Sequence, residues 1–446
     1  MRAPIAVAAT LIVVFSVVTV SAQAQPAASG PLRLTLDEAV ARGLETSHRV
    51  AEAVARSEAA ASAADQRHAA ILPQFAAQAG YSRTNHIETF GILLPNSQLR
   101  VIYPDIPDNY RTRLDAQWPI YTGGRLDAIE RAARIEATAA TDDVAAARRD
   151  LALDITRAYW SLVTADDALR VVEESAARID AHLRDVRNQL AAGLVPPSDV
   201  FAVEAQTSRQ RMLAIQARGA RDVAEAELAR LVGAAPGTPI EPIVALEAPP
   251  AELASIDALI ETAKRQRPER AALTRRLSAS GERRIAAAAG TRPTIGVGGG
   301  FDYARPNPRI FPREEVWRTS WDAGVSVSWP LFDGGRARAE IAEAEASDRA
   351  LREGLAEFDA ALAVEIRQRV TDVATARAAI QAANDAVRSA TEARRVVGER
   401  FSAGVATSTD VLDAQVALLQ AELDRTQAIA NARLADARLA RTVGAP

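Results

Sequence analysis

The chain has 446 residues, of which 48% are hydrophobic, 25% charged and only 4% aromatic. Its formal net charge of −4 at pH 7 argues against non-specific binding to nucleic acids, which requires a basic surface. The chain contains no cysteine, which excludes disulfide bonds, thiolate metal sites, thiol nucleophiles and a lipidated N-terminal cysteine.

The first predicted element in chain order is an export signal over residues 1–24. Arg2 precedes an apolar run from Ile5 to Val20, and residues 21–24 (SAQA) form an A-x-A cleavage site. A transmembrane anchor is the alternative interpretation, but the run is shorter than the ~20 residues that a membrane-spanning helix needs. We therefore expect the mature protein to leave the cytoplasm without a helical membrane span.

The remaining chain is a tandem repeat. The segment AQWPIYTGGR at 116–125 matches VSWPLFDGGR at 327–336, at an offset of 211 residues (327 − 116). Upstream, Pro73 aligns with Pro293 at an offset of 220 (293 − 73). We predict two copies, over residues 25–233 and 254–446, separated by a Pro-rich linker over 234–253.

Each copy contains two segments in which apolar and polar residues alternate, the pattern of a β-strand with one apolar and one polar face. They lie near 72–84 and 110–121 in the first copy and near 292–304 and 316–331 in the second. In a soluble sandwich the apolar face packs on a second sheet, whereas in a transmembrane barrel it faces lipid. The aromatic residues concentrate in and beside these segments, as in the girdles of outer-membrane barrels, which favours the barrel.

Helices occupy the rest of each copy: one before the first strand, and a long helical hairpin over 123–232 or 334–443. In the second copy, apolar residues from Leu351 to Val373 recur at spacings of three and four, which is typical of a coiled-coil stripe. No strong breaker interrupts this stretch, which predicts roughly 100 Å of helix at about 1.5 Å per residue. Gly404 supplies the C-cap, and Thr409 caps the returning helix.

Proline, tryptophan and glycine mark the change from strand to helix in both copies, and their expected role is structural. The predicted transition residues are Pro73, Trp118, Pro119, Gly123, Gly124, Pro293, Trp329, Pro330, Gly334 and Gly335. Four strands cannot close a barrel, which usually has at least about eight, so several copies of the chain must assemble.

This plan resembles the outer membrane efflux protein family, the TolC-type outer membrane factors. The resemblance covers nearly the whole mature chain and rests on the duplicated plan, the two WP…GGR segments, and the tips AGL…DV and AGV…DVLD. It implies an α+β membrane protein: a trimeric 12-stranded β-barrel, four strands per protomer, continuous with a long periplasmic α-helical barrel. It also implies an outer-membrane location extending into the periplasm, contact with outer-membrane lipid, and a passive duct for small molecules.

The family further implies two partners besides the homotrimer, namely a periplasmic adaptor protein and an inner-membrane pump that supplies the energy. By resemblance, Gly193, Leu194, Val195, Gly404 and Val405 at the tips dock the adaptor. The alternative is structural, because glycine commonly follows the end of a helix. An outlet for type I protein secretion is the alternative to drug efflux.

In the family, acids at the positions of Asp410 and Asp413 form the narrowest part of the pore. Crowded carboxylates would give cation selectivity, raised pKa values and block by multivalent cations. Helix capping is the alternative role for Asp410 and for Asp199 in the first copy. The family gate is also tied by a tyrosine and an arginine, where this chain has Phe401 and Ala406, so another contact closes the mouth or the resting gate is looser.

The sequence shows no enzyme signature. The glycines of 296–300 lie inside an alternating strand and open no helix, unlike a dinucleotide loop. The four histidines lack metal-ligand spacing, so we expect no metal, no cofactor and no enzymatic activity. A non-conducting coiled-coil scaffold is the alternative class of function, but it gives no reason for four amphipathic strands with aromatic girdles.

Overall fold

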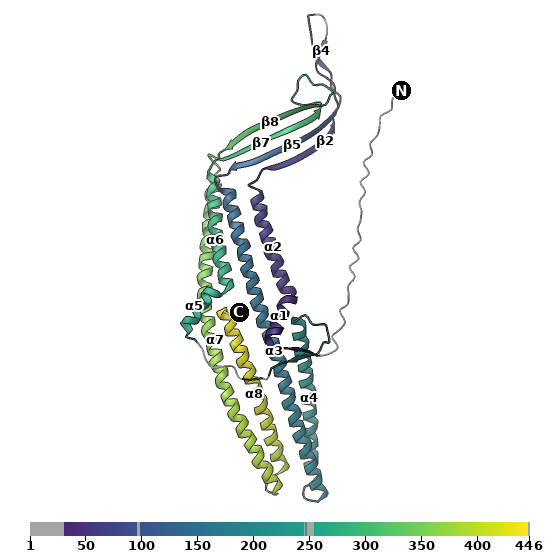
Figure 1. Cartoon of the computed structure of the whole chain (residues 1–446), viewed down its shortest axis with the longest axis vertical. Helices are drawn as coiled ribbons and strands as arrows, with labels where there is room; N and C mark the ends of the chain where they lie inside the picture. Colours follow the sequence, from purple (N-terminus) through teal and green to yellow (C-terminus); the bar gives the residue numbers. More distant parts are fainter. Residues whose placement is uncertain (1–30, 96–98, 245, 248–253, 445–446) are drawn as a thin grey trace, which may run out of the picture.

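The chain is elongated, with a sheet at one end and long helices at the other (Figure 1). A computed structural model describes residues 31–95, 99–244, 246–247 and 254–444. The predicted export signal at 1–24 lies outside the described residues. No helix in the described ranges is long and apolar enough to cross a membrane.

Four antiparallel strands form the main sheet, in the order β2-β5-β7-β8. They are β2 (Gln74–Arg83), β5 (Asp108–Tyr121), β7 (Thr294–Arg305) and β8 (Arg318–Ser328). One face of the sheet carries large apolar side chains that are exposed in the single chain, such as Phe75 (72%), Trp321 (74%) and Val325 (70%). These are the side chains that the alternating pattern assigns to one face.

The two copies build this sheet with the same register. In β2 and β5, Ala77 pairs with Leu114. The corresponding pair in β7 and β8 is Val297 and Val325, which are 220 (297 − 77) and 211 (325 − 114) residues further along. The tandem repeat of the sequence is therefore a tandem repeat of the structure.

Aromatic rings cross the sheet at the end farthest from the helices. Tyr81 contacts Tyr110 with 5.0 Å between ring centroids, and Trp317 lies 5.9 Å from Tyr110 and 4.7 Å from Tyr303. This row spans all four strand positions on the apolar face. It matches the aromatic girdle of an outer-membrane barrel, where amphipathic rings lie at the lipid headgroups.

Two small sheets accompany the main one. The long connection between β2 and β5 forms the hairpin β3 (Phe90–Leu93) and β4 (Leu99–Tyr103), which projects beyond the sheet (Figure 1). At mid-length, β1 (Leu32–Leu34) pairs in parallel with β6 (Ile240–Pro242) of the inter-repeat linker. The alternation pattern of the sequence did not predict these short strands, which are too brief to show a period.

Each copy opens with two helices, where the sequence analysis expected one. They are α1 (Leu36–Thr46) and α2 (His48–Ala69) in the first copy, and α5 (Ile256–Gln266) and α6 (Pro268–Ala288) in the second, followed by a 3-10 turn at Ala289–Thr291. Ser47 caps α2 with its side chain. Pro268 begins α6, because proline cannot continue a helix but fits its first turn.

The shaft consists of two long hairpins that run away from the sheet (Figure 1). The first is α3 (Arg125–Ala191) with α4 (Pro197–Leu231), and the second is α7 (Arg336–Ser402) with α8 (Ser408–Val443). Helices α3 and α7 have 67 residues each, or roughly 100 Å at about 1.5 Å per residue.

The largest buried apolar cluster lies at mid-length and ties the first hairpin to α1, α2 and the small β1–β6 sheet. Tyr159 and Ile155 of α3 are fully buried there, with Leu228 of α4 and Ile240 of β6. The hydroxyl of Tyr159 donates to the carbonyl oxygen of Leu34 at 3.1 Å. Much of the remaining shaft is half-exposed in one chain, so its helices need further neighbours to complete their packing.

Candidate functional site

The candidate site is the pair of hairpin tips at the end opposite the sheet (Figure 1). Gly193 and Gly404 both have φ of +73°, a left-handed conformation that favours glycine. The backbone N–H groups of Leu194 and Val405 donate back into their helices, to Gln189 and Arg400, at 2.9 Å each. A Cβ atom on either glycine would meet nothing within 4 Å, so backbone conformation alone explains these glycines within one chain.

Two of the predicted docking residues are strongly exposed. Leu194 is 74% exposed and Val405 is 63% exposed. Val195, by contrast, is half-buried and packs on a small apolar cluster between the helices near the tip. The tips therefore present one exposed aliphatic side chain each.

Asp410 is engaged in helix capping. The backbone N–H and the hydroxyl of Thr407 both donate to its carboxylate at 2.8 Å, and its own N–H donates to the Thr407 hydroxyl at 3.2 Å. Within one chain, these bonds hold the pKa of Asp410 below its ordinary value, because they stabilise the charged form. The cap is Thr407, not Thr409 as expected, since α8 begins at Ser408.

Asp413 lies one turn further along α8 and is exposed. Among the described residues it has no hydrogen bond or ion pair. Its matching position in the first copy, at the offset of 211, is Ala202. Capping therefore explains Asp410 but not Asp413.

The first tip is simpler. Asp199 is half-buried at the start of α4, and the Ser198 hydroxyl donates to its carboxylate at 3.3 Å. In the described part of one chain, no hydrogen bond joins Asp199 to Phe401 or Ala406, so these three predicted gate positions are not linked there. Ala406 is half-buried between the end of α7 and the Thr407 cap.

Phe401 instead contacts His182 of α3, a residue that the sequence analysis did not select. Their ring centroids are 5.1 Å apart, with the planes at 67°. His182 is only 6% exposed, and its Nε2 lies 3.0 Å from the hydroxyl of Ser408. A sequence signal existed, because Ile179, His182 and Val186 follow the spacing of a buried helix face.

The predicted transition residues turn the chain from sheet to helix. The indole N–H of Trp118 donates to the carbonyl oxygen of Ile71, and that of Trp329 donates to Thr291, at 3.1 Å in both copies. The glycine pairs that follow, Gly123-Gly124 and Gly334-Gly335, all have positive φ. Pro73 and Pro293 directly precede β2 and β7, and Pro119 and Pro330 follow the two tryptophans.

A network of charges lies on the polar face of the main sheet. Asp302 of β7 has a fully buried side chain and accepts from Arg111 at 2.6 Å and from Arg113 at 2.5 Å. Asp322 of β8 also pairs with Arg113, at 3.1 Å, and receives Arg309 from the β7–β8 connection at 2.6 Å. This face therefore carries ionised groups, as expected of a face that lines water.

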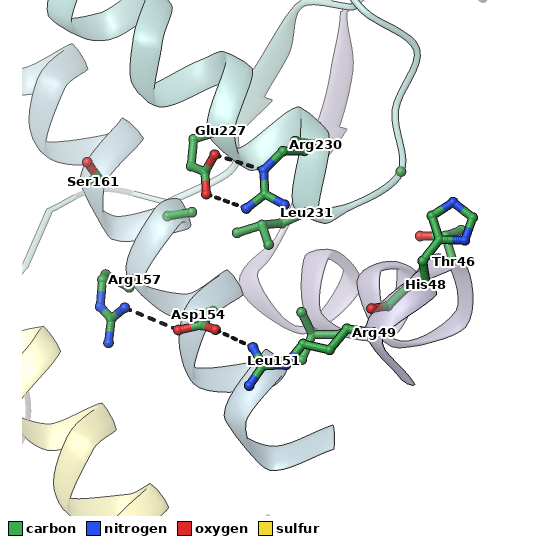
Figure 2. Close-up of a pocket in the computed structure, with 13 residues that line it drawn as sticks. Thr46, His48, Arg49, Leu151, Asp154, Arg157, Ser161, Glu227, Arg230 and Leu231 are labelled. Carbon is green, nitrogen blue, oxygen red and sulfur yellow. Dashed lines mark hydrogen bonds and ion pairs between the residues drawn. The ribbon is translucent and has the colours of Figure 1, made fainter. Parts of the chain in front are cut away.

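A cavity of about 630 Å³ lies at mid-length, where α1 meets α2 beside α3 and the end of α4. Figure 2 shows the residues that line it. The carboxylate of Asp154 lies between the guanidinium groups of Arg49, at 2.9 Å, and Arg157, at 3.1 Å. Arg230 pairs with Glu227 at 2.6 Å. Each of these charged groups therefore has a partner of opposite charge at the wall of the cavity. Across the described ranges, no cluster of three or more histidine or acidic residues has the arrangement of a metal site.

Comparison with known proteins agrees with this architecture. The chain matches the model of the outer membrane efflux protein family over residues 40–234 and 259–445. It is similar to protein CyaE of Bordetella pertussis, 26% identical over 303 residues that cover 67% of this chain and 63% of CyaE. It is also similar to outer membrane protein TolC of Vibrio cholerae, 24% identical over 310 residues that cover 68% of each chain.

The fold is similar to that of a solved relative. The outer membrane protein VceC from Vibrio cholerae superposes with a TM-score of 0.75 and 22% identity, over 92% of this chain and 96% of that chain. The expected fold class, a β-sheet of barrel type continuous with long helical hairpins in a tandem repeat, is confirmed. The chain belongs to the outer membrane efflux protein family.

Proposed function

We propose that three copies of this chain close into an outer-membrane exit duct. Four strands from each copy give a barrel of 12 strands (4 × 3), and the hairpins continue it as a periplasmic tube of helices. The duct passively conducts small molecules, such as drugs and other toxic compounds, that an inner-membrane pump delivers through a periplasmic adaptor. The polar, ionised face of the sheet lines this passage.

The observation that carries the proposal is the shared register of the two copies. Within the chain, β5 of the first copy pairs with β7 of the second, so the copies meet in the middle of the sheet. The outer edges, β2 and β8, are unpaired in the described chain. Exposed edges of this length invite further pairing. If β8 meets β2 of the next copy as β5 meets β7, all six repeats become equivalent and the barrel closes without an edge.

This equivalence predicts the contact between protomers. Gln117 pairs with Gly298 within the chain. In the second repeat, the residue equivalent to Gln117 is Ser328 (117 + 211). In the first repeat, the residue equivalent to Gly298 is Gln78 (298 − 220). We therefore expect Ser328 to pair with Gln78 of the neighbouring copy. Both side chains are on the polar face. Paired Cα atoms in such strands lie only about 5 Å apart, within reach of a disulfide.

Because the chain has no cysteine of its own, only introduced cysteines can form disulfide bonds in a test of this contact. We expect the Gln78→Cys, Ser328→Cys double variant to form covalently linked dimers and trimers on oxidation in outer membranes, as seen on non-reducing gels. The matched control is Gln78→Cys with Gly324→Cys, which keeps the polar face but shifts the register by four residues, or roughly 13 Å. Efficient linkage in the control, or none in the predicted pair, would contradict this closure.

The tips are proposed to be the periplasmic mouth and the adaptor-docking surface. Leu194 and Val405 support this role, because they are exposed aliphatic side chains on rigid turns and permit another helical hairpin to pack closely. Deleting the gene and measuring sensitivity to dyes, bile salts and antibiotics, alongside protein export, tests the substrate class. Increased sensitivity with normal protein export supports efflux, whereas the reverse supports a protein-secretion outlet.

A further inference from the structure

His182 joins the two hairpins close to their tips. It lies on α3, in the first hairpin, and its Nε2 is 3.0 Å from the hydroxyl of Ser408, the first residue of α8. Its ring packs edge-on against Phe401 in the last turn of α7, with 5.1 Å between centroids. One side chain of the first hairpin thus touches both helices of the second.

Other polar contacts between α3 and α8 lie farther from the tips. Arg178 donates to Glu422 at 2.8 Å, and the hydroxyl of Thr426 donates to Asp167 at 2.6 Å. Arginine and carboxylate groups keep their charges throughout the neutral range. Of these contacts between the hairpins, the His182 contact alone has a partner that titrates near neutral pH, and it is the one nearest the mouth.

The surroundings of His182 suit a neutral imidazole. Burial lowers the pKa of His182, whereas the charge of Asp185 on the same helix and a hydrogen bond with the backbone of Ser408 oppose that effect. The partners from α7 and α8, Phe401 and Ser408, are uncharged. Helix α4 contributes Val200 and Val203 to the adjoining apolar cluster.

The nearest charged residues of the second hairpin are engaged elsewhere. Arg400 of α7 donates to the carbonyl oxygen of Val405 at 3.4 Å, and the carboxylate of Asp410 accepts from Thr407. In the described chain, neither Arg400 nor Asp410 forms a hydrogen bond or ion pair with the imidazole ring. A proton on His182 would be buried beside a hydroxyl and an aromatic ring.

We propose that His182 is the positioning residue that holds the second hairpin against the first at the periplasmic mouth, and that its protonation releases that hairpin. This inference rests on the proposed duct with its mouth at the tips. It also explains how the mouth can close although this chain has Phe401 where the family has a tyrosine. Phe401 takes part in the closing contact through its ring and needs no polar group.

The pH dependence has a definite sign. The pKa of His182 is lower in the closed contact than in the released hairpin, where the imidazole has its ordinary pKa near about 6.5. The contact therefore has its full stability above about pH 6.5, and it loses stability as the pH falls below that value. The equilibrium should shift toward the released state by up to about tenfold for each unit between the two pKa values. Acid therefore opens the mouth.

Single-channel recording of the full chain in planar bilayers tests this at about pH 7.5 and about pH 5.5. We expect the open probability of the wild type to rise on acidification. His182→Ala should be open at both pH values. His182→Gln, which keeps a neutral hydrogen-bonding nitrogen, should stay closed at both. His68→Gln, a change of a half-exposed histidine near the sheet, should keep the wild-type pH step.

A second measurement does not depend on conduction. Spin labels on Leu194→Cys and Val405→Cys report the separation of the two tips by pulsed electron resonance, since both sites are exposed and the chain has no other cysteine. We expect longer distances in acid, and no change in the His182→Gln background. An acid-induced widening that persists in His182→Gln, or tips that stay together in His182→Ala, would overturn the proposal. If the protein formed no trimers and showed no conductance, the proposed duct would be refuted. The proposal for His182 would still be tested, because the spin labels measure the separation of the tips without conduction.

Discussion

At the residue scale, the two acids of the second tip have different surroundings although they lie three residues apart. The carboxylate of Asp410 accepts hydrogen bonds from the backbone N–H and the hydroxyl of Thr407, and these bonds stabilise the first turn of α8. Asp413 is exposed and has no such partner in the described chain. In the proposed trimer, we expect the charge of Asp413, which forms no hydrogen bond or ion pair in the described chain, to act on ions at the mouth.

We expect Asp413→Asn to weaken block by a trivalent cation on the order of tenfold, because three like charges at a narrow mouth are removed together. Titrating the blocker on the periplasmic side of single channels measures this. The matched variant Asp410→Ala should change block less but lower helix stability, because it removes the capping box formed with Thr407. Equal block in Asp413→Asn and wild type would contradict the assignment of Asp413 to the constriction.

The cap also has a pH dependence. Since the pKa of Asp410 is lowered in the folded chain, its stabilising contribution is present above the ordinary carboxyl value and is lost as the pH falls through the lowered one. In Asp410→Ala this acid-sensitive contribution to unfolding should be absent.

At the element scale, the change from strand to helix is built twice from the same parts. Each tryptophan indole reaches back to the carbonyl oxygen at the end of the preceding helical segment, Trp118 to Ile71 and Trp329 to Thr291. The bond fixes the angle at which the sheet leaves the shaft. It also satisfies a carbonyl that the helix end leaves unpaired.

We predict that Trp118→Phe and Trp329→Phe each lower the free energy of unfolding by about 1 kcal/mol, because each removes one hydrogen-bond donor and keeps an aromatic ring. The control is Trp321→Phe, whose side chain is 74% exposed on the apolar face and whose indole has no hydrogen bond in the described chain. Thermal unfolding followed by circular dichroism in detergent makes the comparison. Equal losses in all three variants would show that the indole bond is unimportant.

At the scale of the whole molecule, the sheet is held on its polar face by charges from three strands and one connection. Asp302 is fully buried and forms ion pairs with Arg111 and Arg113. Gly300 makes room for this arrangement, since a Cβ there would lie 2.5 Å from the guanidinium carbon of Arg113. Within the glycine-rich stretch of β7, Gly300 is thus explained by packing against Arg113.

Asp302→Asn should lower the stability of the assembled protein by about 3 kcal/mol, because it removes the charge of a fully buried carboxylate that pairs with the mostly buried Arg113 and the half-exposed Arg111. Asp115→Asn is the matched control, since Asp115 is 23% exposed and contacts Arg113 alone. The temperature at which trimers dissociate on mild detergent gels measures the difference. A smaller loss in Asp302→Asn than in Asp115→Asn would contradict the central place of Asp302 in the network.

Much of the architecture could be predicted from the sequence because it depends on local periodicity. Alternation over ten or more residues identifies β2, β5, β7 and β8, and glycines with nearby caps identify the hairpin tips. The brief strands β3, β4, β1 and β6 could not be predicted this way, because three to five residues show no period. The break between α1 and α2 was likewise missed, since the capping Ser47 is a weak signal by itself.

The tandem repeat, the apolar and polar faces of the strands, and the family could all be predicted from the sequence, since each follows from residue types at fixed spacings along one segment. The partners of individual side chains became known only from the folded chain. Folding places His182 between Phe401 and Ser408, and Asp302 between two arginines, across separations of 189 to 226 residues. The physical reason is that burial and hydrogen bonding depend on how helices and strands pack against one another, which no spacing within a single segment records.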